Sequence, residues 1–263
     1  MHEEALDLAF VDAVAEAQGP HLTTSGTIVD IDIHFVGGGG HWEQRWEVAD
    51  IGFIVNFRRS GTLLRTKVVL LQSKRLYPRE AEFTEYKGVV RPGGFGSLMQ
   101  PSLPATLGPR TFRFDESCHY KALQVGDRQW QSISQYENSY GLPVHYMLYH
   151  PHSMPTEASI PVVVPLGAPS GPAKVGVRVL PAGCLRNLTS DFARNRAPSY
   201  RDLQNEYGEV GIRLPQFVVD RVLSCFEGYV VDDGDENEGL RRVFNLRSAP
   251  IAAAVRIDIN IPE

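Results

Sequence analysis

The segment LLRTKVVLLQSKRL (63–76) is apolar on both faces through its middle and then presents two polar side chains, Gln72 and Lys74. A short continuous apolar run is typical of a strand in the centre of a sheet. Because side chains alternate between the faces of a strand, Gln72 and Lys74 share one face, and Leu71 and Ser73 share the other. Burying an unpaired charge costs several kcal/mol. We therefore expect the amide and the ammonium group at this strand end to have a functional role.

An acidic partner lies on the strand predicted just upstream, WEVADIGFIVNF (46–57). The polar sequence RRSG (58–61) predicts a turn that joins the two strands as a short hairpin. Counted back from this turn, Asp50 falls roughly opposite Gln72 and Lys74. The sequence therefore predicts that a carboxylate, an amide and an ammonium group converge. It also places Lys74 at the rim of the sheet, where its replacement would cost little packing.

The rest of the chain predicts an α/β fold with a mixed sheet, in which three strands form a meander directly after a helix. The expected elements are a helix at 3–18, strands at 27–36, 46–57 and 63–76, a loop at 88–111, a helix at 127–139, strands at 143–150, 162–166 and 174–181, helices at 199–207 and 214–227, an acidic loop at 232–239 and a strand at 251–261. Since no internal repeat and no clean linker is evident, we expect a core over residues 1–150 and a C-terminal α/β extension over 151–263, packed together as one domain.

The three polar groups suit the hydrolysis of a phosphodiester bond. The Asp50 carboxylate and the Gln72 amide oxygen are hard ligands of the kind that Mg²⁺ or Mn²⁺ takes, and Mg²⁺ keeps several waters. Such a metal polarises a phosphate and lowers the pKa of a bound water. Lys74 can orient that water and offset the negative charge that builds on the phosphate. Glutamine in place of an acid removes one charge, so we expect weaker metal binding.

The motifs Asp50-Ile51-Gly52 and Leu70-Leu71-Gln72-Ser73-Lys74 resemble motifs II and III of the PD-(D/E)xK nuclease superfamily. The resemblance is strongest to Mrr-type restriction endonucleases and anti-phage defence nucleases that carry QxK. It implies a restriction-endonuclease-like core of helix, β-meander, helix and strand, which this chain offers in order over about residues 3–150. Ala49 stands where the proline of the superfamily's name would be.

The resemblance also assigns roles to individual residues. It implies that Asp50, Gln72 and Lys74 are catalytic, and that Asp50 and Gln72 bind the metal. Glu4, or its neighbour Glu3, matches the acid of the superfamily's first helix. Glu47, three residues before Asp50, is a further candidate metal ligand.

Two candidate substrate-binding residues, Arg75 and Gln129, complete this set. Arg75 follows Lys74 at the strand end, and Gln129 lies on the helix after the QxK strand, which in the superfamily often faces the substrate backbone. Other interpretations remain open at this point. Lys74 and Arg75 can form an ordinary charged exit from a strand, Asp50 can be a turn residue, and the helix at 127–139 can be a solvated amphipathic helix.

A zinc site of His145, His150 and His152 is disfavoured, because alternation puts His145 and His150 on opposite faces of one strand.

Composition limits the class of protein and the cellular compartment to which this chain can be assigned. The chain has 263 residues, of which 43% are hydrophobic and 22% charged, as in an ordinary globular protein. Its net charge of −5 gives no global nucleic-acid signature. Three widely spaced cysteines suit a reducing cytoplasm. No apolar run approaches the roughly 20 residues that span a bilayer, and the first ten residues, MHEEALDLAF, carry acids where a signal peptide needs bases. We therefore expect a cytoplasmic protein without a membrane partner.

The resemblance implies a Mg²⁺-dependent DNA endonuclease that serves as an effector in bacterial anti-phage defence. No recognisable DNA-reading module is present, so activation is expected to come from a homo-oligomer or a partner defence protein. The alternative is a catalytically weak or inactive nuclease-fold subunit that acts as a nucleic-acid-binding or scaffold protein in a larger complex. The acidic net charge and Gln72 favour the alternative, whereas Asp50 and Lys74 favour the enzyme.

Overall fold

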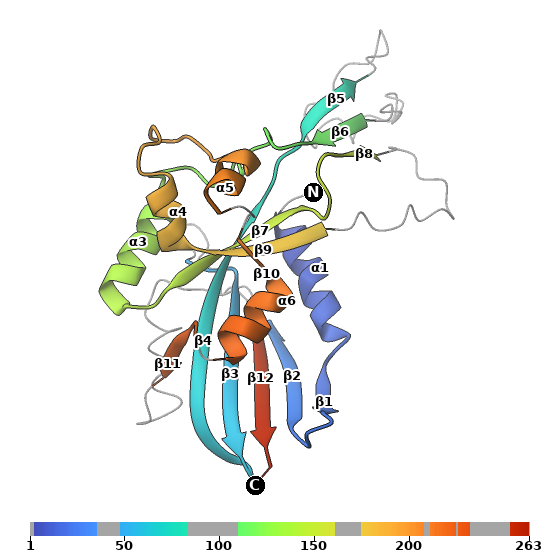
Figure 1. Ribbon diagram of the computed structural model, residues 1–263, viewed down its shortest axis with the longest axis vertical. Coiled ribbons are helices and arrows are strands. Elements are labelled where there is room, and N and C mark those ends of the chain that lie inside the picture. Colours follow the sequence, from blue (N-terminus) through green and yellow to red (C-terminus); the bar gives the residue numbers. More distant parts are fainter. Residues whose placement is uncertain are drawn as a thin grey trace, which may run out of the picture.

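The computed structural model describes residues 3–35, 48–83, 110–160, 175–207, 211–224, 226–231 and 253–262 (Figure 1). The strand expected at 162–166, the acidic loop at 232–239 and nearly all of the loop at 88–111 lie outside these residues.

In the described part of the chain, a mixed sheet of nine strands forms the body of the molecule. The strands are β1 (Gly19–Leu22), β2 (Ile28–Phe35), β3 (Ile51–Arg59), β4 (Thr62–Arg75), β7 (Val144–Pro151), β9 (Val175–Pro181), β10 (Ile212–Arg213), β11 (Tyr229–Val231) and β12 (Ala253–Ile261). They are ordered β1-β2-β12-β3-β4-β7-β9-β10, and β11 pairs with β4. The predicted α/β class with a mixed sheet is confirmed.

Helices cover both faces of this sheet. They are α1 (Glu3–Ala15), α3 (Arg128–Tyr140), α4 (Ala182–Leu188), α5 (Tyr200–Tyr207), α6 (Leu214–Phe217) and a π-helical turn, η1 (Val218–Leu223). On what we call the α3 face, Val68 and Leu70 of β4 pack in one apolar cluster with α3, α4 and α5. On the opposite face, the α1 face, Val69 and Leu71 pack in a second cluster with α1 and α6. Because β4 is covered on both sides, its sequence is apolar at consecutive positions.

The expected meander of three consecutive strands is wrong. The hairpin of β3 and β4 forms as predicted, but β12 lies between β2 and β3, antiparallel to β2 and parallel to β3 (Figure 1). The apolar side chain of Ile257 pairs in register with Ile31 on one side and with Val55 on the other. A strand from the far end of the chain therefore continues the apolar α1 face between them. Residues 1–150 and 151–263 share one sheet as a result.

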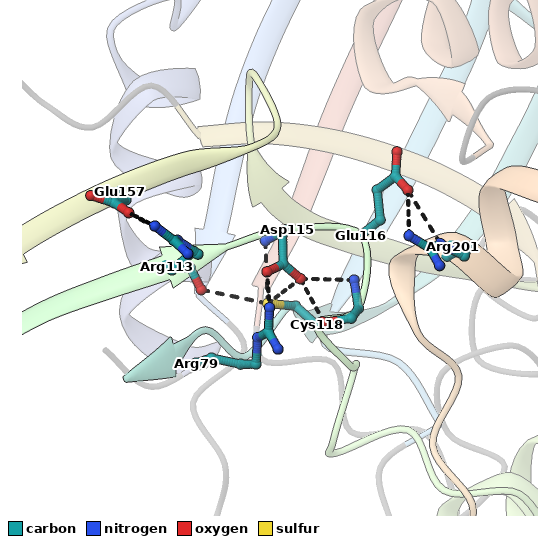
Figure 2. A network of polar contacts seen from close by, with 8 residues as sticks. Arg79, Arg113, Asp115, Glu116, Cys118, Glu157 and Arg201 are labelled. Carbon is teal, nitrogen blue, oxygen red and sulfur yellow. Dashed lines mark hydrogen bonds and ion pairs between the residues drawn. The ribbon is translucent and has the colours of Figure 1, made fainter. Parts of the chain in front are cut away.

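A smaller sheet projects from the end of the molecule where β4 and β7 finish (Figure 1). It contains β5 (Arg79–Phe83), β6 (Arg110–Phe114) and β8 (Thr156–Ile160). Figure 2 shows the ion pairs around it: Arg79 with Asp115, Arg113 with Glu157 at 2.6 Å, and Arg201 of α5 with Glu116 at 3.0 Å. These three arginines are already paired with acids, so they do not form a ready-made basic surface.

Two local signals fix the helix before β7. The Asp127 side chain accepts a hydrogen bond from the backbone N–H of Trp130 at 2.7 Å, which caps the start of α3. Gly141, with φ of 66°, ends it in the left-handed conformation that glycine adopts readily. None of the helices in the described part of the chain combines the length and the apolar character that crossing a bilayer requires.

Candidate functional site

Asp50 and Gln72 meet at the end of the β3–β4 hairpin. The backbone N–H of Asp50 donates to the carbonyl of Leu71 at 2.9 Å, which puts Asp50 across from Gln72, one residue before β3 begins. The Gln72 side chain then donates from Nε2 to Oδ2 of Asp50. The pairing that was expected from the length of the hairpin brings these two residues into direct contact.

Among the described residues, the other end of the Gln72 amide has no hydrogen-bond partner. Gln72 is only 2% exposed, and its buried Oε1 accepts no hydrogen bond from this part of the chain. Leaving a buried acceptor unpaired costs about 1–3 kcal/mol. Asn56 provides a comparison on the same sheet, because its Nδ2 donates to Asp258 at 3.0 Å while its Oδ1 accepts from Thr66 at 2.8 Å. The Gln72 amide is therefore the one of these two that is left with an unused oxygen beside a carboxylate.

This donor set fits a weakly held Mg²⁺ or Mn²⁺. The Asp50 carboxylate and the Gln72 Oε1 would supply two oxygen ligands, and waters can complete the coordination of Mg²⁺. Within the described ranges, no group of three or more His, Cys, Asp and Glu side chains is arranged to hold a metal. The fit therefore rests on the carboxylate and the amide together rather than on a cluster of acids.

Lys74 is a buried residue, so its expected place at the rim is wrong. Its side chain is only 4% exposed, and its Nζ lies 3.5 Å from Oε2 of Glu3 on α1. The reason is the length of β4, which continues past the first residue of β3 and brings its last residues against the start of α1. The Oε1 of Glu3 also accepts the backbone N–H of Arg75 at 3.3 Å.

The remaining predicted residues are placed as follows. Glu3 of the first helix contacts the strand end, while the side chain of Glu4 and the whole of Glu47 lie outside the described part of the chain. The guanidinium of Arg75 stacks over the ring of Tyr77, with Cζ 3.8 Å from the ring centroid. Gln129 is half-buried in the first turn of α3.

Three residues that sequence reasoning missed join the same strand end. Ser73 Oγ donates to Oδ1 of Asp7 at 2.6 Å, and Tyr149 Oη donates to the same oxygen at 2.8 Å. The backbone N–H of Ser73 donates to Oδ2 of Asp50 at 2.6 Å. One signal for Asp7 was present in the sequence, because it stands four residues after Glu3 and so on the same side of a helix.

Burial raises the pKa of Asp7 above its usual value of 3.8, although the hydrogen bonds from Ser73 and Tyr149 oppose this shift. The folded chain therefore binds this proton more tightly than the unfolded chain does. As the pH rises through the interval between 3.8 and the higher folded pKa, the wild-type chain loses stability relative to an Asp7→Asn variant. Urea unfolding of both proteins across acidic to neutral pH measures this difference, with Asp12→Asn at an exposed position of α1 as the control. A constant difference across the series would contradict the prediction.

The two buried histidines of β7 lie on opposite faces, as alternation predicts. On the α1 face, His145 Nε2 is 3.5 Å from Oε2 of Glu227. On the α3 face, His150 Nδ1 donates to the carbonyl of Pro151 at 2.7 Å, and its ring packs on Tyr200. They do not share a site.

Comparisons of the chain with protein families, with curated proteins and with solved structures each found no match.

Proposed function

We propose that the chain is a metal-dependent nuclease that hydrolyses phosphodiester bonds in DNA, and that Asp50, Gln72 and Lys74 carry the reaction. The observation that carries this proposal is the buried, unpartnered Oε1 of Gln72 beside the Asp50 carboxylate, on the strand end that also bears Lys74. An unsatisfied buried oxygen next to a carboxylate suits a cation, and Lys74 adds a positive charge that suits a phosphate.

In this proposal each side chain has a separate task. Asp50 and Gln72 would hold Mg²⁺ or Mn²⁺, which when bound polarises the phosphate and lowers the pKa of a water. Lys74 offsets negative charge on the phosphate as the bond breaks. Glu3 holds the ammonium group of Lys74 near this point until substrate arrives.

The order of elements supports a restriction-endonuclease-like core. Helix α1, the β3–β4 hairpin, helix α3 and strand β7 follow one another, and β7 lies parallel to β4. This chain adds β12 within the sheet, between β2 and β3. Strand β12 borders β3 on the side away from β4, and the backbone N–H of its first residue, Ala253, donates to the carbonyl of Asp50 at 3.1 Å.

We further propose that assembly activates the chain, as a homo-oligomer or with a partner defence protein, in an anti-phage role. Non-specific binding to nucleic acid depends mainly on the neutralisation of phosphates by lysine and arginine. The net charge is −5, and Arg79, Arg113 and Arg201 are paired with acids. The surface of a second copy of the chain, or of a partner protein, would supply the missing positive charge.

One observation favours the alternative, a weak or inactive nuclease-fold subunit that binds nucleic acid or serves as a scaffold. Lys74 is almost fully buried and already paired with Glu3, so a substrate must displace an existing contact to reach it. Under this alternative, the contacts at the strand end only hold α1 against the sheet, and Mg²⁺ has no effect on the chain.

Plasmid cleavage separates the two proposals. The purified chain is assayed over a range of protein concentrations in Mg²⁺, in Mn²⁺ and in EDTA, at about 100 mM salt. We expect nicking that needs the metal, that rises more steeply than linearly with protein concentration, and that falls at least about 100-fold in Asp50→Asn. The matched control is Asp30→Asn, at an exposed position on β2. Cleavage that persists in EDTA, or in Asp50→Asn, would refute the assigned metal site.

A further inference from the structure

Asp7 joins α1 to the sheet through two short hydrogen bonds. Its Oδ1 receives hydrogen bonds from two neighbouring strands, from Ser73 of β4 at 2.6 Å and from Tyr149 of β7 at 2.8 Å. The contacts that Glu3 makes one turn earlier are longer, at 3.5 Å to Lys74 Nζ and 3.3 Å to the N–H of Arg75.

Ser73 connects Asp7 to the residues of the proposed metal site. Its hydroxyl group donates to Asp7 on the α1 face, while its backbone N–H donates to Oδ2 of Asp50, the oxygen that also accepts from Gln72. Ser73 therefore connects α1 to Asp50 through one hydrogen bond from its side chain and one from its backbone, and the same Asp50 carboxylate also contacts the Gln72 amide.

We propose that Asp7 is a positioning residue, which fixes the first turn of α1 on β4 and β7 so that Glu3 remains in contact with Lys74. This inference rests on the proposed function of the same strand end. The first turn of a helix frays readily when nothing holds it. Because Glu3 and Asp7 are four residues apart, the anchor at Asp7 sets where the Glu3 carboxylate can reach.

Asp7 acts through its neighbours rather than as a metal ligand. Alternation places the hydroxyl of Ser73 on the opposite face of β4 from Gln72 and Lys74, and Asp7 binds that hydroxyl. In the described part of the chain, Asp7 also does not join two other acids in a group that could hold a metal.

The reactivity of the Lys74 amine tests this role without substrate or metal. The folded chain is acetylated with a trace of acetic anhydride, and the rate at Lys74 is read by mass spectrometry. We expect Asp7→Ala to raise this rate at least about fivefold, because the loss of two hydrogen bonds frees the first turn and uncovers the amine. Asp7→Asn retains an oxygen that can accept both hydrogen bonds, so it should stay within about twofold of the wild type.

Two controls separate positioning from a general loss of stability. Val11→Ala removes a buried side chain, 2% exposed, from the same helix without touching the hydrogen bonds, and Asp12→Ala removes an exposed acid. Both should leave the Lys74 rate near that of the wild type. If Asp7→Ala does not fold, Ser73→Ala and Tyr149→Phe each remove one of the two bonds and should raise the rate by smaller factors.

The inference is overturned if Asp7→Ala acetylates at the wild-type rate, or if Val11→Ala raises the Lys74 rate as much as Asp7→Ala does. Neither result depends on cleavage. A chain that never cuts DNA would remove the proposed function and leave the acetylation result standing.

Discussion

Replacement of Lys74 by methionine is expected to lower the rate of DNA cleavage by at least about 100-fold while the chain still folds. Removing one group that compensates charge in a transition state commonly costs about 3–4 kcal/mol, which corresponds to that factor. Methionine is suited to this test because Lys74 is only 3% exposed, so truncation to alanine would leave a void at the strand end. Glu3 keeps the backbone N–H of Arg75 as a partner. The measurement is the rate of plasmid nicking at saturating Mg²⁺.

Lys67→Met is the matched control. Lys67 is also buried on β4, at 1% exposure, but alternation puts it on the α1 face, where its Nζ donates to the carbonyl of Val222 at 3.1 Å. Its replacement should lower the melting temperature and leave the rate per folded molecule unchanged. The proposed role of Lys74 fails if Lys74→Met melts with the wild type and cuts at the wild-type rate, or if Lys67→Met loses cleavage to the same extent.

The contact between Asp50 and Gln72 could be predicted because it is local. The turn at 58–61 pairs Arg58 with Leu63, and a register shift of one residue between Phe57 and Arg58 then places Asp50 across from Gln72. Alternation along a strand likewise separates Ser73 from Gln72 and Lys74 without any knowledge of the rest of the chain. Alternation follows from spacing alone, whereas the exact partner of Asp50 also depends on the register shift next to the turn.

The parts that could not be predicted depend on long-range contacts. The partner of Lys74 is 71 residues away on α1, and nothing in the sequence of β4 indicates how far the strand extends past β3. For Ser73, the sequence indicated only the face of β4 on which its side chain lies. Its role as a hydrogen-bond donor depends on Asp7, which helix α1 brings to that face. The place of strand β12 in the sheet also could not be predicted. Alternating apolar residues fit many positions in a sheet and do not specify the one between β2 and β3.

Replacement of Gln72 by glutamate is expected to make the chain depend on a divalent cation for stability. The Gln72 amide now donates to Asp50, so a carboxylate in its place would put two negative charges within hydrogen-bond distance. Without metal we expect a loss of about 1–3 kcal/mol in the free energy of unfolding. With Mn²⁺, the added charge beside a cation should raise the binding affinity at least about tenfold, since a unit charge about 4 Å away is worth about 4 kcal/mol at an effective dielectric of 20. Titration calorimetry and thermal unfolding, each with and without Mn²⁺, measure the two effects.

Asn56→Asp creates the same kind of carboxylate pair away from the site and serves as the control. Asn56 donates to Asp258 as Gln72 donates to Asp50, but its own oxygen is already bonded to Thr66, so no ligand position is open there. This variant should lose stability that Mn²⁺ does not restore. Weaker Mn²⁺ binding in Gln72→Glu would mean that the amide oxygen does not face the metal. Cleavage is not expected to rise with affinity in this variant, because the new carboxylate shares a face with Lys74 and can pair with the ammonium group that the reaction needs.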